Sequence, residues 1–251
     1  MRIALNGSTL GPCGLDEELS AAAEAGFSLV ELRAPKLEGV TDLRRRLDSR
    51  GLRALSVNSL EGAGERDLRE PARRQAAWAA GCGAPYVVCV PGRRREGLED
   101  AVAALAELCR QEGAELAFEF MGFAWSAVRT LPAALAVHPG PVVIDTFHWA
   151  LGGSSPEDLR ACDPKRIALV HVNDAPAERM ATLVDEDRVL PGEGTLPLDG
   201  FYRALLDIGY LDAGAGGVLS LELFSPVPAR RAHAAMTRLA RSLVPGGVAG
   251  G

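Results

Sequence analysis

The feature that most constrains the fold is a unit that recurs along the whole chain: a helical pattern, a glycine or proline that ends it, and a short apolar run. The first apolar run covers Arg2 to Asn6, and a helical stripe from Leu15 to Ala25 ends at Gly26. Apolar residues spaced three or four apart are typical of a helix, whereas short alternating or continuous apolar runs are typical of strands. Counted in this way, the sequence predicts eight strands that alternate with helices.

The later units follow the same rule. Further strands are expected at 29–32, 52–58, 86–90, 116–120, 167–171 and 219–223, and the apolar run 142–149 contains a strand with Asp145 at its carboxyl end. Helices are expected at 42–50, 68–80, 98–109, 127–137, 156–161, 201–208 and 230–243, with a long connection over 174–198. Alternating strands and helices pair in parallel through right-handed crossovers, and eight such units close into a barrel. No Gly-x-Gly-x-x-Gly follows the first strand, which disfavours an open dinucleotide-binding sheet.

The sequence therefore predicts an α/β protein with a single domain, a (β/α)8 TIM barrel over residues 1–244. The remaining residues, 245–251, are small and flexible and have nothing to bury. We expect this tail to be disordered.

Charge and hydropathy exclude several classes of protein. The chain of 251 residues has a formal net charge of -6, which offers no general attraction for nucleic acid or anionic lipid. No apolar run is long enough to span a bilayer, and the N-terminus lacks the apolar region of a signal peptide. We therefore expect a cytoplasmic protein without a nucleic-acid or membrane partner; monomer and homodimer both remain open.

The cysteines agree with a cytoplasmic location, which is a reducing environment. The chain has five, an odd number, and no Cys-x-x-Cys pair. Buried reduced thiols are favoured over a disulfide framework or a zinc knuckle.

Four of the expected strands end on a group that can bind a metal or move a proton: Glu119, Asp145, His171 and Glu222. These strands are the fifth to the eighth and are neighbours in the ring, so their carboxyl ends meet at the mouth where barrel chemistry is found. Three carboxylates and an imidazole suit one divalent ion, Mn²⁺ first, with Mg²⁺, Co²⁺ and Zn²⁺ as alternatives. The competing interpretation is a network of ordinary interior polar groups; four groups in register favour the metal.

Four segments of the chain resemble a known family. They are Asp145-x-x-His148, His171-x-x-Asp174, the stretch 187–194, and the ending Gly209-Tyr210 with Leu221-Glu222-Leu223-Phe224. Together they resemble the sugar phosphate isomerase/epimerase group of the xylose isomerase-like TIM barrel superfamily, over nearly the whole chain. That superfamily includes ketose 3-epimerases, hydroxypyruvate isomerase, inosose and dehydroshikimate dehydratases, and nucleases of the endonuclease IV type.

The resemblance implies roles for particular residues. Glu119, Asp145, His171 and Glu222 match metal ligands, Glu119 and Glu222 match the catalytic pair that moves protons, and His148 matches a position that contacts substrate. The chain departs from the family at Asn173, where a lysine is common, and at Ala177, where ketose epimerases have an arginine. Arg188 is the candidate to supply that cation.

The chemistry of such a site follows from its charges. Removing a proton from the carbon next to a carbonyl leaves negative charge on the carbonyl oxygen, and a divalent cation on that oxygen stabilises the metal-bound enediolate. Two glutamates then serve as base and acid. The sequence thus predicts an isomerase or epimerase of a small polyhydroxylated keto compound. A dehydratase of the inosose or dehydroshikimate type is the alternative. A non-catalytic barrel is less favoured. A DNA-repair nuclease is also less favoured, because Asn58 and Pro91 lie where such a nuclease needs histidines.

Several other residues are interpreted from their place just after the strands. Trp125 and Phe224 are expected to line the substrate pocket with His148 and Arg188. Asp174 is expected either to orient His171 from behind or to brace the following loop. Glu31 and Arg33 are expected to pair with each other.

Overall fold

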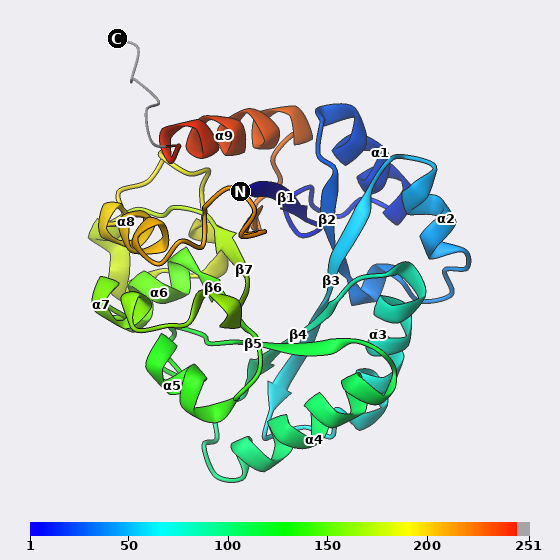
Figure 1. Cartoon of the computed structure of the whole chain (residues 1–251), viewed down its shortest axis with the longest axis horizontal. Helices are drawn as coiled ribbons and strands as arrows, with labels where there is room; N and C mark the ends of the chain where they lie inside the picture. Colours follow the sequence, from blue (N-terminus) through cyan, green and yellow to red (C-terminus); the bar gives the residue numbers. More distant parts are fainter. Residues whose placement is uncertain (245–251) are drawn as a thin grey trace.

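Eight parallel strands form a closed ring in the order β1-β2-β3-β4-β5-β6-β7-β8, as the predicted barrel requires (Figure 1). The structure, a computed structural model, describes residues 1–244, and the tail expected at 245–251 lies outside the described residues. The ring closes where Arg2 to Leu5 pair with Val218 to Leu221. The strands are β1 (Arg2–Asn6), β2 (Leu29–Arg33), β3 (Arg53–Ala63), β4 (Tyr86–Pro91), β5 (Glu115–Glu119), β6 (Val142–Asp145), β7 (Ile167–Val172) and β8 (Val218–Leu221).

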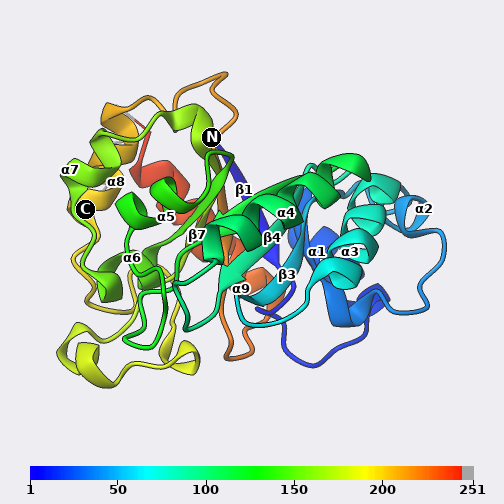
Figure 2. The same ribbon diagram turned by 90° about the horizontal axis from the view of Figure 1, so that it is seen from below.

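Helices surround the ring on its outside (Figures 1 and 2). They are α1 (Leu15–Ala25), α2 (Leu43–Asp48), α3 (Arg69–Cys82), α4 (Leu98–Gln111), α5 (Leu131–Val137), α6 (Thr146–Gly152), α7 (Pro156–Arg160), α8 (Asp199–Asp207) and α9 (Ala229–Ser242). Short 3-10 turns occur at η1 (Ala34–Lys36), η2 (Pro164–Arg166), η3 (Ala177–Thr182) and η4 (Asp185–Asp187). In the described part of the chain, no helix is both long and apolar enough to cross a membrane.

The core has two layers because side chains on a strand alternate between the inside of the barrel and the surrounding helices. The inner layer takes one buried apolar residue from each strand: Ala4, Leu29, Leu55, Val88, Ala117, Val143, Leu169 and Val218. The outer layer packs the opposite strand faces, such as Ile144 and Val170, against the helices. An inward residue is followed, two positions later, by another inward residue. Because of this spacing, Glu31, Glu119, Asp145 and His171 face the inside of the barrel, two residues after the apolar residues of the inner layer.

The main difference from the predicted elements is a helix that begins directly after β6. No helix was expected between the strand that ends near Asp145 and the helix at 156–161, but α6 begins at Thr146, directly after Val142 to Asp145. The Asp145 side chain explains the change, because it accepts hydrogen bonds from the backbone N–H groups of Phe147 and His148 and so caps the helix. His148 therefore lies on a helix.

The cysteines agree with the expectation of reduced thiols. All five are unpaired, and Cys82, Cys89, Cys109 and Cys162 are buried. Burial raises the pKa of the Cys109 thiol to about 12. Such thiols behave as small apolar side chains.

Candidate functional site

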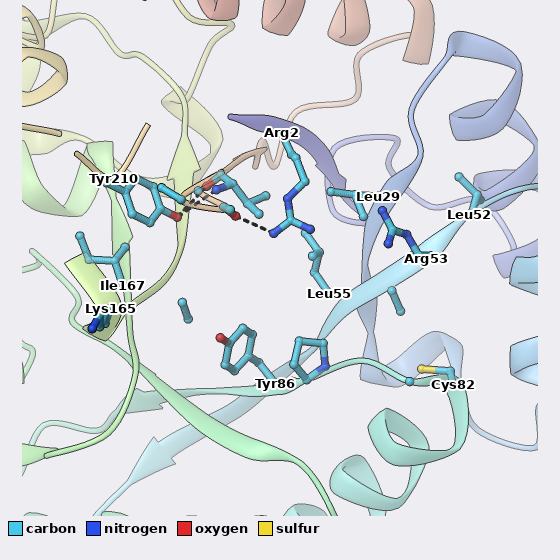
Figure 3. A pocket seen from close by; sticks show the side chains of 18 of the residues that line it. Arg2, Leu29, Leu52, Arg53, Leu55, Cys82, Tyr86, Lys165, Ile167 and Tyr210 are labelled. Carbon is cyan, nitrogen blue, oxygen red and sulfur yellow. Dashed lines mark hydrogen bonds between the residues drawn. The ribbon is translucent and has the colours of Figure 1, made fainter. Parts of the chain in front are cut away.

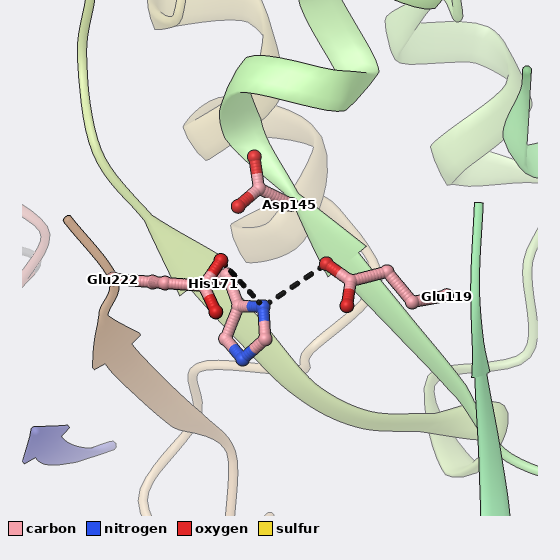
Figure 4. Close-up of side chains that lie close together, drawn as sticks. All are labelled: Glu119, Asp145, His171 and Glu222. Atoms are coloured by element: carbon pink, nitrogen blue, oxygen red, sulfur yellow. Dashed lines mark hydrogen bonds and ion pairs between the residues drawn. The ribbon is translucent and has the colours of Figure 1, made fainter. Parts of the chain in front are cut away.

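The four predicted metal ligands meet at the carboxyl ends of β5 to β8 (Figure 4). Glu119 and Asp145 end β5 and β6, His171 is the fifth residue of β7, and Glu222 directly follows β8. One ligand atom from each residue lies within 4.8 Å of the other three, and all four residues are buried. The structure therefore brings together the full set that the sequence singled out.

The spacing of these atoms suits a divalent ion. His171 Nδ1 lies 3.0 Å from Glu119 Oε1 and 3.4 Å from Glu222 Oε2. Ligands about 2.1 Å from an octahedral ion lie roughly 3.0 Å apart when adjacent and about 4.2 Å apart when opposite. The two distances from His171 Nδ1 fall within this range. Three carboxylates and one imidazole nitrogen also match the preference of such ions for oxygen and nitrogen donors.

Arg188 is part of the same cluster. The sequence suggested that it binds substrate, and the structure buries its side chain, leaving 2% of the residue exposed. Its Nη1 donates to Asp145 Oδ2 at 2.8 Å and to Glu222 Oε2 at 2.7 Å, while Nη2 donates to Asp185 Oδ1 at 2.7 Å. Arg188 thus neutralises two carboxylates of the cluster from one side and leaves them free lone pairs for a second cation.

Glu31 is a component of the site that the sequence interpretation missed. It does not pair with Arg33; its carboxylate lies inside the barrel, fully buried, with Oε1 3.0 Å from His171 Nε2. The sequence did contain a signal for this. Glu31 lies in the apolar strand Leu29-Val30-Glu31-Leu32, just as each of the four predicted metal ligands lies in an apolar strand. Arg33 instead lies over the ring of Phe224.

The two glutamates of the cluster have different electrostatic surroundings. Burial raises the pKa of Glu119 to about 7, against the opposing charge of His171. Burial also acts to raise the pKa of Glu222, but His171 and Arg188 outweigh it, and the pKa ends below its ordinary value. Environments that separate the pKa values of two carboxyl groups are typical of acid–base sites.

His148 lies beside the cluster on α6. Arg188 Nη2 lies 3.0 Å from its Nε2, while its Nδ1 has no hydrogen-bond partner among the described residues. Burial, reinforced by the charge of Arg188, holds the pKa of His148 well below its usual range, so its ring is neutral at neutral pH. A neutral imidazole with an unused nitrogen is suited to hydrogen-bond a substrate oxygen.

A cavity of 560 Å³ opens above these groups. Its lining includes both glutamates of the cluster and all four residues expected to contact substrate: His148, Arg188, Trp125 and Phe224. Trp125 is 41% exposed and stacks on Phe123, so it stands at the rim, where a ligand can cover it. The volume suits a small molecule.

Asp174 does not orient His171, which corrects one of the two roles proposed for it. Its Oδ1 accepts from the backbone N–H groups of Ala175 and Leu196, and its Oδ2 from that of Gly192. It therefore braces the loop after β7, the other role considered. Glu31 occupies the position behind His171.

A second cavity, of 610 Å³, lies at the opposite end of the barrel, where the strands begin (Figure 3). It contains none of the predicted site residues, and two of its polar side chains bond to the backbone: Arg2 donates to Gly216 O, and Tyr210 Oη to Val218 O. Chemistry in barrels of this type belongs to the carboxyl ends of the strands. We therefore assign the candidate site to the smaller cavity.

Fold and site together define a class: (β/α)8 barrels that carry a carboxylate–histidine centre across the ends of their last four strands. Comparison with known families places the chain more narrowly. Residues 19–242 match the family described as xylose isomerase-like TIM barrel, and the chain belongs to that family. The resemblance inferred from the sequence motifs is confirmed.

Relatives and solved structures agree with this assignment. The inosose isomerase of Bacillus licheniformis is 29% identical over 90% of both chains, and that of Bacillus velezensis is 26% identical over 90% of this chain and 89% of its own. The crystal structure of IOLI protein with a binding zinc atom covers 100% of both chains with a TM-score of 0.85 and 25% identity. A D-psicose 3-epimerase, solved in the presence of D-fructose, shares the fold at 15% identity, a TM-score of 0.75, and coverage of 98% of this chain and 100% of its own. The prediction of an isomerase- or epimerase-type enzyme agrees with these relatives.

Proposed function

We propose that the protein is a divalent-metal-dependent isomerase or epimerase of a small polyhydroxylated keto compound, a sugar or a sugar-like ring such as an inosose. The observation that carries the proposal is the placement of Glu119 and Glu222 on either side of His171, facing one cavity and converging with Asp145. The inosose isomerases that align over most of the chain support it.

Glu119, Asp145, His171 and Glu222 would hold the ion. The donor set is rich in oxygen and favours Mn²⁺, with Mg²⁺, Co²⁺ and Zn²⁺ as alternatives, and the IOLI protein was solved with zinc. A bound divalent ion would supply a Lewis acid that stabilises negative charge on the substrate's carbonyl oxygen.

The protein's own groups move the proton. Glu222 accepts hydrogen bonds from Arg188 Nη1 at 2.7 Å and from Asn6 Nδ2 at 3.0 Å, which stabilise it as a carboxylate. Glu119 has only His171 as a side-chain partner among the described residues. We assign Glu222 as the base that takes the proton from carbon and Glu119 as the acid that returns one.

The other lining residues position the substrate. Trp125 and Phe224 offer apolar faces, and His148 Nδ1 offers a hydrogen bond for a hydroxyl. Arg188 carries its positive charge beside the base, with Nη1 2.7 Å from Glu222 Oε2, and it lines the cavity that would hold the substrate. Arg188 would thus supply the positive charge that ketose epimerases take from an arginine at the position of Ala177.

Two glutamine variants test the proton-transfer roles. Glu119→Gln and Glu222→Gln keep the shape of each side chain and remove its basicity, so turnover should fall about 10²- to 10⁴-fold in each. Glu61→Gln is the matched control, because Glu61 lines the same cavity but is exposed, and Ser59 is the only side-chain partner of its carboxylate among the described residues. Circular dichroism shows whether the fold is retained. Turnover near the wild-type rate in either active-site variant would contradict the assignment.

A substrate panel in D₂O tests the reaction type. The Mn²⁺-loaded protein is incubated with ketoses, hydroxypyruvate, inosose and dehydroshikimate, and the products are followed by mass. An isomerase or epimerase retains the substrate's formula and introduces deuterium at carbon when the abstracted proton exchanges with solvent. A product lighter by one water would establish a dehydratase and replace our proposal.

A further inference from the structure

We infer that Glu31 is a positioning residue for His171: it holds the imidazole with its proton on Nε2 and thereby turns the Nδ1 lone pair toward the carboxylate cluster. The inference rests on the proposed function, since it concerns the ion that this cluster would hold. Glu31 has no part in the motifs that identify the family, and it comes from the other half of the barrel, on β2.

The two imidazole nitrogens of His171 face different carboxylates. Nε2 lies 3.0 Å and 3.2 Å from the two carboxylate oxygens of Glu31. Nδ1 lies on the side of Glu119 and Glu222, at 3.0 Å and 3.4 Å. Glu31 and the cluster therefore contact opposite edges of one ring (Figure 4 shows the cluster edge).

The surroundings of Glu31 keep it an ionised acceptor. Four side chains besides His171 direct donors at its carboxylate: Ser56 Oγ at 2.7 Å, Asn58 Nδ2 at 3.1 Å, Asn6 Nδ2 at 3.4 Å, and Ser220 Oγ. A carboxylate that only accepts requires a proton on the imidazole nitrogen that faces it. With that proton on Nε2, a neutral His171 has its lone pair on Nδ1, the atom that faces the ligand set.

Glu31 acts through His171 and not on the substrate. It is fully buried, and it is not among the residues that line the mouth cavity. Metal-binding histidines commonly donate their second N–H to a carboxylate, and loss of that carboxylate typically weakens metal affinity about 10- to 100-fold. A purely structural network would show no such coupling to the metal.

The test replaces the carboxylate by an amide of the same shape. Glu31→Gln should bind Zn²⁺ and Mn²⁺ about 10- to 100-fold more weakly than the wild type in a chelator competition. Glu18→Gln is the matched control, because Glu18 is another buried glutamate, 1% exposed, that pairs with Lys36 away from the cluster. Its metal affinity should equal that of the wild type.

A second measurement reports the tautomer directly. In the Zn²⁺-loaded wild type with ¹⁵N-labelled histidine, His171 should show a protonated Nε2 and a metal-bound Nδ1 in NMR spectra. In Glu31→Gln the Nε2–H signal should shift or vanish. Ser220→Ala removes one donor to Glu31 but keeps the carboxylate, so this milder variant should retain the tautomer with a smaller loss of affinity, and it stands in if Glu31→Gln does not fold.

The outcomes separate the two proposals. If the wild type binds no divalent ion, the proposed function fails. If the wild type binds one and Glu31→Gln matches it in affinity and in the Nε2–H signal, only the role of Glu31 is overturned.

Discussion

Replacing Arg188 by methionine should make the protein depend on a divalent ion for its stability. Arg188 Nη1 bonds to Asp145 and Glu222 inside the protein, so Arg188→Met leaves two buried carboxylates without that cation. Removing one partner of a buried ion pair costs about 3–5 kcal/mol. For a domain of this size, each kcal/mol lowers Tm by about 2–4 °C, so the metal-free variant should melt roughly 6–20 °C below the wild type.

A divalent ion bound beside the same carboxylates replaces the lost charge. The rise in Tm on adding Mn²⁺ should therefore be larger in Arg188→Met than in the wild type. Calorimetry on chelator-treated and Mn²⁺-loaded samples measures both values. Arg33→Met is the control, since Arg33 lines the same cavity and contacts Phe224 but makes no ion pair within the described residues. An equal loss of Tm in both variants, or a smaller rise with Mn²⁺ in Arg188→Met, would refute this account.

Two further expectations concern packing and reactivity. A Cβ added at Gly152 would lie 1.9 Å from the backbone oxygen of Arg129, so Gly152→Ala should destabilise by about 1–3 kcal/mol. Gly81→Ala, in the open on α3, should instead raise Tm by a few degrees, about 1 kcal/mol in stability, because alanine is the better helix former; the same sign of Tm shift in both variants would contradict the packing argument. Of the five thiols only Cys13 is not buried, so iodoacetamide at pH 8 should label one site in the native protein and five after unfolding. Rapid labelling of a second site in the native state would show that a buried thiol is accessible.

The barrel and the four cluster residues were predictable because both depend on periodicity. Strand side chains alternate, so each acid or histidine faces away from its apolar neighbour, and those neighbours, such as Ile144 and Val170, pack outward against the helices. Consecutive strands of a parallel barrel are neighbours, which places their ends together. No knowledge of side-chain conformation was needed for Glu119, Asp145, His171 or Glu222.

The helix α6 could not be predicted in this way. Thr146, Phe147 and Trp149 are residues that favour strands, and periodicity continues the run from β6 through them. The switch depends on the Asp145 side chain turning back to cap the helix, which is a matter of rotamer and not of pattern. The same carboxyl group that serves the cluster therefore also starts the helix that carries His148.

Glu31 was misassigned for a different reason. Residues two apart on a strand share a face, which made an ion pair with Arg33 attractive. The alternative partner, His171, is 140 residues away in the sequence, and its proximity follows only from the diameter of the closed ring. The sequence around Glu31 indicates an acid on an apolar strand, but it carries no local signal for a partner across the interior of the barrel.

Pairing of the first and last strands has a consequence for the order in which the site forms during folding. β8 has only β7 and β1 as neighbours, and its contact with β1 joins residues at opposite ends of the described chain. Contacts so distant in sequence are costly in loop entropy and form slowly. Glu222 follows β8 directly, so an intermediate that has not docked its last strand presents three ligands instead of four. The rate at which a divalent ion binds during refolding would then report the rate at which β8 docks and closes the ring.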